Sequence, residues 1–73
     1  MSKKLKLCSG QEAVHKFQRA GWSIARQKGS HLMMTKPDFE YTISIPLHNE
    51  LGIGILRKLI KLAGISIEQF NNL

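Results

Sequence analysis

The chain has 73 residues, room for one domain with a modest core, and its 42% hydrophobic content is typical of a folded protein. Eleven lysines and arginines against five aspartates and glutamates give a net charge of +6, which favours a nucleic-acid partner but also serves solubility alone. A single cysteine excludes a disulfide framework and no apolar run is long enough for a membrane span, so we expect one soluble, cytoplasmic domain over residues 1–73.

The first expected element is a helix that starts after Ser9 and ends at Gly21, with residues 1–8 as a basic lead-in. Ser9 and Glu12 have the S-x-x-E spacing of a capping box, in which each side chain accepts a hydrogen bond from the other residue's backbone N–H. Gly21 suits the positive φ that often ends a helix. His15 is expected on the solvent side. The expected apolar face recurs at helical spacing and consists of Ala13, Val14, Phe17 and Ala20.

Three short extended segments follow, joined by short turns. Residues 22–26 alternate large and small side chains as a half-buried strand does, and residues 32–35 form a second extended run. Turns are expected at residues 28–30 and at Pro37-Asp38. Residues 41–45 alternate strictly, which predicts a three-stranded antiparallel meander. Tyr41, Ile43 and Ile45 are expected to share one face of the third strand, with Thr42 and Ser44 on the other.

A second helix is expected from Gly54 to Ala63, with Gly64 as its end, after a loop that starts at Pro46. Ser66 and Gln69 repeat the capping-box spacing and predict one further helical turn. The apolar face of the second helix is expected to consist of Ile55, Leu56, Leu59, Ile60, Leu62 and Ala63. The fold class is therefore α+β, a single small domain in the order α-β-β-β-α. Its expected core includes Val14, Phe17, Trp22, Ile43, Leu56 and Ile60.

Cations gather on the remaining arc of the second helix. Arg57, Lys58 and Lys61 share this arc at about 100° per residue. We expect them to contact phosphate, although a solvated polar face is the ordinary alternative. Gly52 and Gly54 would let the backbone near the helix N-terminus approach an anion. Three more cations lie close to His31 in sequence and are expected to extend the positive surface: Arg26, Lys28 and Lys36.

His31 stands between a turn and an apolar run, and three roles are open to it. A metal ligand needs partners, but the other histidines are at 15 and 48 with no metal-ligand spacing, so no metal site and no cofactor are expected. A histidine that starts a strand can also be a packed structural residue. As a general acid or base it would suit RNA cleavage, because the substrate supplies its own nucleophile, the 2′-OH, and cations stabilise the charge on the phosphate.

An ordered set of motifs runs from Ser9 to Phe70. It comprises SGQE at residues 9–12, AGW at 20–22, RQKGSH at 26–31, PLH at 46–48, EL at 50–51 and GILRKLIKLAGI at 54–65. Together these motifs resemble the HicA toxins, which are small mRNA interferases of HicAB toxin–antitoxin systems.

This resemblance implies a fold like the double-stranded-RNA-binding domain, with both helices on one face of the sheet. It implies metal-independent cleavage of RNA, with His31 of the G-S-H motif as the catalytic residue. It also implies a cognate HicB-like antitoxin that binds the toxin and blocks the site.

The sequence therefore predicts the toxin of a type II toxin–antitoxin system, an endoribonuclease that cleaves mRNA with His31. His48, in the loop after the third strand, is a candidate second catalytic group or RNA contact. Two alternatives stay open: a non-catalytic RNA-binding module of the same fold, and a small protein whose basic face meets only an acidic protein. The residues expected to bind RNA are Arg26, Lys28, Ser30, Lys36, Arg57, Lys58 and Lys61.

Overall fold

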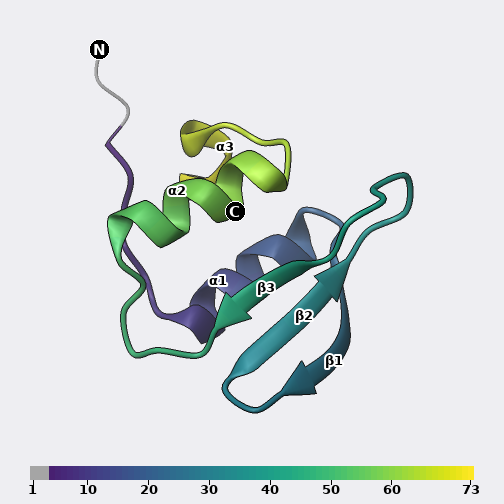
Figure 1. Ribbon diagram of the computed structural model, residues 1–73. Coiled ribbons are helices and arrows are strands. Elements are labelled where there is room, and N and C mark those ends of the chain that lie inside the picture. The colour runs from purple at the N-terminus through teal and green to yellow at the C-terminus, as the bar shows by residue number, and fades with distance from the viewer. Residues whose placement is uncertain (1–3) are drawn as a thin grey trace.

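The computed structural model of the protein describes residues 4–73 (Figure 1). Its elements in chain order are α1 (Gly10–Arg19), β1 (Ser23–Lys28), β2 (His31–Thr35), β3 (Ile43–Pro46), α2 (Ile53–Leu62) and α3 (Ile67–Asn71). The predicted α+β class and α-β-β-β-α order are confirmed, and α3 is the predicted further turn. Residues 1–3 of the expected lead-in lie outside the described residues. Across residues 4–73, every helix is too short or too polar to cross a membrane.

Both predicted capping boxes are formed. At the start of α1 the Ser9 hydroxyl accepts from the backbone N–H of Glu12 at 3.0 Å, and the Glu12 carboxylate accepts from the N–H of Ser9 at 2.9 Å. Ser66 and Gln69 repeat the arrangement at α3. Gly21 ends α1 with a φ of +101°, the left-handed conformation that glycine adopts without strain.

The sheet is an open antiparallel meander in the order β1-β2-β3. Gly29, with a φ of +60°, and Ser30 form the two-residue turn between Lys28 and His31, whose Cα atoms are paired. Because neighbouring strand residues point to opposite faces, the register gives the sheet two different sides. The inner side, which faces the core, carries Leu32, Met34, Ile43 and Ile45; the outer side carries His31, Met33, Ser44 and Pro46.

Two expectations about the strands were wrong in detail. Every residue of β1 is exposed, because β1 is an edge strand and an irregularity between Ile24 and Arg26 interrupts its alternation. Tyr41 lies outside β3 and is 45% exposed, while Ile43 and Ile45 are buried. The Tyr41 hydroxyl instead donates to the Leu62 carbonyl at 2.6 Å, which ties the β2–β3 loop to the end of α2.

The helices and the inner side of the sheet enclose one core. In Figure 1, α1 lies behind the sheet, α2 stands beside the free edge of β3, and α3 lies on the far side of α2. The helices flank the sheet, and both long helices contribute side chains to the same buried cluster as its inner side. All six residues of the expected core are buried, and the largest side chains that join them are Met34, Ile45, Leu51 and Phe70.

The start of α1 is joined to the loop that leaves β3. The N–H of Gly10 donates to the His48 carbonyl at 2.9 Å, and the N–H of Leu51 donates to the Cys8 carbonyl at 2.8 Å. A Cβ atom on Gly10 would overlap the Pro46 carbonyl oxygen. A side chain is therefore excluded at residue 10 by backbone that belongs to the end of β3.

This close approach predicts that Gly10→Ala destabilises the fold. Relief of the overlap requires α1 or the end of β3 to move, and overpacking of this kind costs about 1–3 kcal/mol. Gly54→Ala is the matched control, because Gly54 is helical and nothing lies within 4 Å of a Cβ placed there. The free energy of unfolding of Gly54→Ala should equal that of the parent or exceed it by up to about 1 kcal/mol, because alanine favours a helix more than glycine does. Urea unfolding of both variants measures the difference, and equal stability would contradict the packing described for Gly10.

The α1 capping box also predicts a pH dependence of stability. The N–H of Ser9 is the main reason that the pKa of Glu12 lies below its ordinary value of 4.5. The Glu12 carboxyl binds a proton more readily in the unfolded chain than in the folded one. The stabilisation of the fold by ionised Glu12 is therefore fully present above the ordinary pKa and is lost as the pH falls through the lower pKa of the folded state. Glu12→Gln keeps an acceptor but cannot titrate. Its melting temperature should therefore fall less steeply than the parent's as the pH is lowered, and parallel curves would contradict this role for Glu12.

Candidate site around His31

His31 is an exposed residue at one end of the sheet. It is the first residue of β2, directly after the Gly29-Ser30 turn, and its Cα is paired with Lys28 on β1 and with Pro46 on β3. This register places it on the outer side of the sheet, opposite the inner side that carries Leu32 and Met34. Because the side chain is exposed, His31 is not a packed core residue, and its imidazole is open to a ligand.

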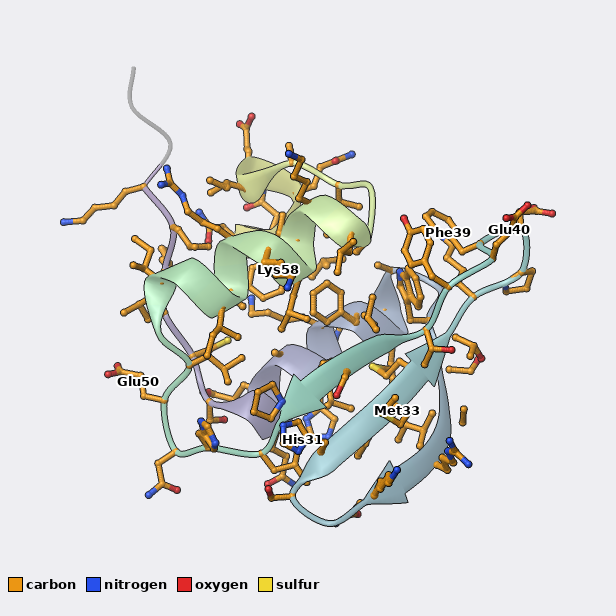
Figure 2. The ribbon with its side chains drawn as sticks, in the orientation of Figure 1. His31, Met33, Phe39, Glu40, Glu50 and Lys58 are labelled. Atoms are coloured by element: carbon orange, nitrogen blue, oxygen red, sulfur yellow. The ribbon has the colours of Figure 1, made fainter. Side chains whose placement is uncertain are left out.

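A shallow hollow lies between His31 and α2. Its volume is about 350 Å³. His31 and Lys58 are both in its wall, and Figure 2 shows them on β2 and α2, with β3 between these elements. Ile55, predicted for the buried face of α2, is 42% exposed and also lines it. None of the described residues in its wall is acidic; the others are Thr42, Ser44, Pro46, Leu59 and Leu62.

Three further predicted residues lie next to His31. The pairing of Lys28 with His31, and of Arg26 with Met33, puts both cations on the outer side of the sheet. Ser30 precedes His31 in the turn, and its carbonyl accepts from the N–H of Leu47 at 2.7 Å. This bond fixes the turn against the chain that leaves β3, so the backbone that carries His31 is held from both sides.

The other predicted cations are more scattered than the sequence indicated. Arg57 and Lys61 are exposed on α2 but lie further round the helix than Lys58 and do not line the hollow. Lys36 follows the opposite end of β2 from His31, and its Nζ lies 5.4 Å from the centre of the Phe39 ring. The structure therefore brings Lys28, Arg26 and Lys58 around His31 and leaves Lys36 apart.

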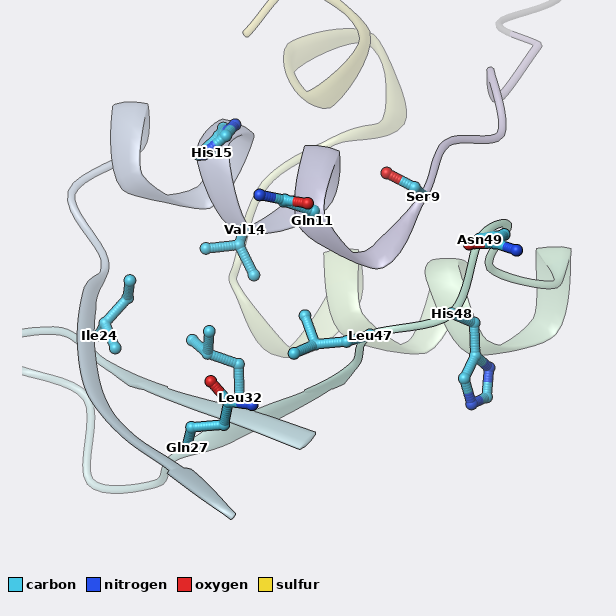
Figure 3. Close-up of a pocket in the computed structure, with 10 residues that line it drawn as sticks. All are labelled: Ser9, Gln11, Val14, His15, Ile24, Gln27, Leu32, Leu47, His48 and Asn49. Carbon is cyan, nitrogen blue, oxygen red and sulfur yellow. The ribbon is translucent and has the colours of Figure 1, made fainter. Parts of the chain in front are cut away.

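His48 lies at the border of a second hollow, which sequence reasoning missed. This groove, of about 450 Å³, separates α1 from the inner side of the sheet near the hairpin turn. Figure 3 shows the ring of His48, an exposed residue, turned away from α1. The groove is lined by Ser9, Gln11, Val14, His15, Ile24, Gln27, Leu32, Leu47, His48 and Asn49.

Other reactive groups do not form a site of their own. Burial, followed by the charge of Glu12, raises the pKa of the Cys8 thiol, which makes the thiolate scarce and the residue a poor nucleophile. In the part of the chain that the structure describes, no three His, Cys, Asp or Glu side chains are grouped as metal ligands would be.

The fold and site define a small basic α+β domain that presents a histidine beside lysines on the open face of its sheet. A family model described as the HicA toxin of bacterial toxin–antitoxin systems matches residues 10–65. Since this match covers most of the 73 residues, the chain belongs to the HicA toxin family. It runs from the first residue of α1 to just beyond α2 and so includes His31 and Lys58. Membership implies an antitoxin partner. Comparison with curated proteins gives no match.

Proposed function

We propose that this protein is the toxin of a type II toxin–antitoxin system and that it cleaves mRNA without a metal ion, with His31 as general base or acid. The observation that carries the proposal is the exposed position of His31, in one hollow with Lys58 and next to Lys28 on the same side of the sheet. The family match and the net charge of +6 support the same interpretation.

The proposed reaction is attack of the ribose 2′-OH on the adjacent phosphorus. As general base, His31 takes the proton of the 2′-OH while the O2′–P bond forms and the P–O5′ bond breaks. The O5′ leaving group takes a proton from a second donor, for which His48 is the candidate within the loop after β3. The products are a 2′,3′-cyclic phosphate and a 5′-hydroxyl. Lys58 and Lys28 stabilise the negative charge that develops on the phosphoryl oxygens.

The proposed RNA path follows the outer side of the sheet near the hairpin turn. Arg26 and Lys28 hold the backbone on one side of His31, and Lys58 holds it on the other. Ser30 contributes a hydroxyl beside the reacting phosphate, and Arg57 and Lys61 add positive charge further along α2. Lys36 is outside this path because it lies beyond the far end of β2.

The antitoxin, which we propose is HicB-like, inhibits by covering the same hollow. Ile55 lies in its wall and is 42% exposed, and Ile53, at the start of the same helix, is 54% exposed. These apolar side chains beside cations suit a protein surface that combines apolar and acidic residues.

The catalytic assignment predicts that His31→Ala abolishes cleavage but not folding. Loss of a general acid or base lowers the rate by about 10²–10⁴-fold, whereas loss of one neutral contact lowers RNA affinity by at most about tenfold. The measurement is cleavage of labelled RNA in a chelator, with circular dichroism as the check on folding. Thr35→Ala is the matched control, because Thr35 is exposed at the opposite end of β2.

Equal cleavage by the parent and His31→Ala would contradict the assignment. Cleavage by neither protein, with RNA binding intact in both, would favour the non-catalytic RNA-binding module.

The arrangement of cations predicts different salt dependences for two lysine variants. Removal of one cation that binds a phosphate of single-stranded RNA lowers the slope of log affinity against log salt by about 0.7. Lys58→Gln should show this change and Lys36→Gln should not, because only Lys58 lies in the hollow with His31. Filter binding over a salt series measures both slopes. Equal changes would show that the cations act as a diffuse field instead of as positioned phosphate ligands.

A further inference from the structure

The groove between α1 and the inner side of the sheet has an apolar bottom and a polar rim. Figure 3 shows Val14 on α1 facing Leu32 on β2 across it, with Leu47 at one end and Ile24 at the other. Gln11 extends from α1 at the rim. Ile24 is 48% exposed, so the groove leaves a large apolar side chain in contact with water.

We propose that this groove binds one unpaired nucleobase of the RNA whose phosphate lies at His31, and that it gives the protein its base preference. The proposal rests on the proposed function, because it adds a recognition site to the same substrate.

The lining matches a heteroaromatic ring in its chemistry. A base presents apolar faces, which the half-buried Leu32 and the exposed Ile24 can contact, and a polar edge with both donors and acceptors. Amide side chains supply both kinds of group, and the rim carries three of them, Gln11, Gln27 and Asn49. Sites for small polar aromatics commonly combine an apolar lining with a few placed polar groups.

One of these amides is already held in position. The Gln27 Nε2 donates to the Gly29 carbonyl at 3.0 Å, so the side chain is fixed by the same turn that carries His31. A fixed amide loses less conformational freedom when it binds a ligand and discriminates better between bases.

The groove and the His31 hollow are adjacent across the end of one strand. Leu32 follows His31 in β2, and consecutive strand residues point to opposite faces. RNA that bends around the exposed Gly29-Ser30 turn would therefore place a phosphate at His31 and a neighbouring base at Leu32. Lys28, exposed on the same turn, supplies positive charge along this route.

Charge favours RNA over an acidic protein segment as the occupant. None of the described residues in the groove wall is an aspartate or glutamate, so the wall does not repel a polyanion. The same lining contains no lysine or arginine to pair with carboxylates. The competing occupant of the groove is an apolar side chain from an antitoxin. Methyl NMR spectra recorded with an oligoribonucleotide and then with purified antitoxin distinguish these two occupants.

The test uses the 73-residue chain with the substitution His31→Ala, which we expect to bind RNA without cutting it, and short homopolymeric oligoribonucleotides of adenosine, cytidine and uridine. Methyl NMR follows Val14, Leu32 and Leu47, and fluorescence polarisation gives the affinities. We expect shifts of these methyl signals and a preference for one base. Gln11→Ala in this background should lower the affinity for the preferred oligonucleotide by about two- to tenfold, the effect of one hydrogen bond. Gln18→Ala, on the same helix but outside the groove, should leave it unchanged.

Binding without shifts of the groove methyls, or equal behaviour of Gln11→Ala and Gln18→Ala, would overturn the base site while the nuclease assignment stands. Methyl shifts that occur only when purified antitoxin is added would overturn it in favour of a protein contact. Absence of any oligonucleotide binding, together with absence of cleavage by the parent, would overturn the proposed function as well.

Discussion

The contact between the first residue of α1 and the end of β3 is the constraint on which the rest of the structure depends. Gly10 lies so close to Pro46 that only a glycine fits, and its N–H donates to the His48 carbonyl. Pro46 is paired with His31, and the next residue, Leu47, donates to the carbonyl of Ser30. One junction therefore fixes the helix, the exit from β3 and the hairpin turn relative to one another.

Two hollows adjoin this junction, one on each side of the sheet. On the inner side, the gap between α1 and the hairpin becomes the groove with amides at its rim. On the outer side, His31 and Lys58 share a hollow that α2 closes. A small domain with a single core has few places for a site. Here two hollows lie on opposite sides of β2, and consecutive residues of that strand line them: His31 lines one and Leu32 the other. The proposed path of RNA over both hollows therefore requires a strand that bends around the hairpin turn.

Local signals in the sequence predicted the elements well, because they act within a few residues. The capping boxes at Ser9 and Ser66 were confirmed, as was the end of α1 at Gly21. The sequence also predicted the antiparallel meander, but it did not show the details of pairing and packing between segments. The edge position of β1 and the irregularity between Ile24 and Arg26 leave all of its residues exposed. Tyr41 leaves the face that it was expected to share with Ile43 and Ile45, and its hydroxyl donates to a carbonyl of α2.

The site was predicted only in part for the same reason. Helical periodicity placed Arg57, Lys58 and Lys61 on one arc, but the angle at which α2 packs on the sheet decides that Lys58 alone faces His31. Sequence proximity suggested Lys36, yet an extended strand carries it away from His31. The residues that line the groove belong to α1, β1, β2 and the loop after β3. Because these segments are separate in the sequence, no single motif could indicate the groove. The need for glycine at residue 10 was equally hidden, since the clashing atom lies far along the chain.

The identity of the RNA ends that the protein produces tests the central claim most directly. If His31 activates the 2′-OH, mass spectrometry of fragments made in the presence of a chelator should show 2′,3′-cyclic phosphate and 5′-hydroxyl ends, and a substrate with 2′-deoxyribose at the cleaved position should resist cleavage. Fragments with 3′-hydroxyl and 5′-phosphate ends, or cleavage of the deoxy-substituted substrate, would mean that water is the nucleophile and would contradict the account.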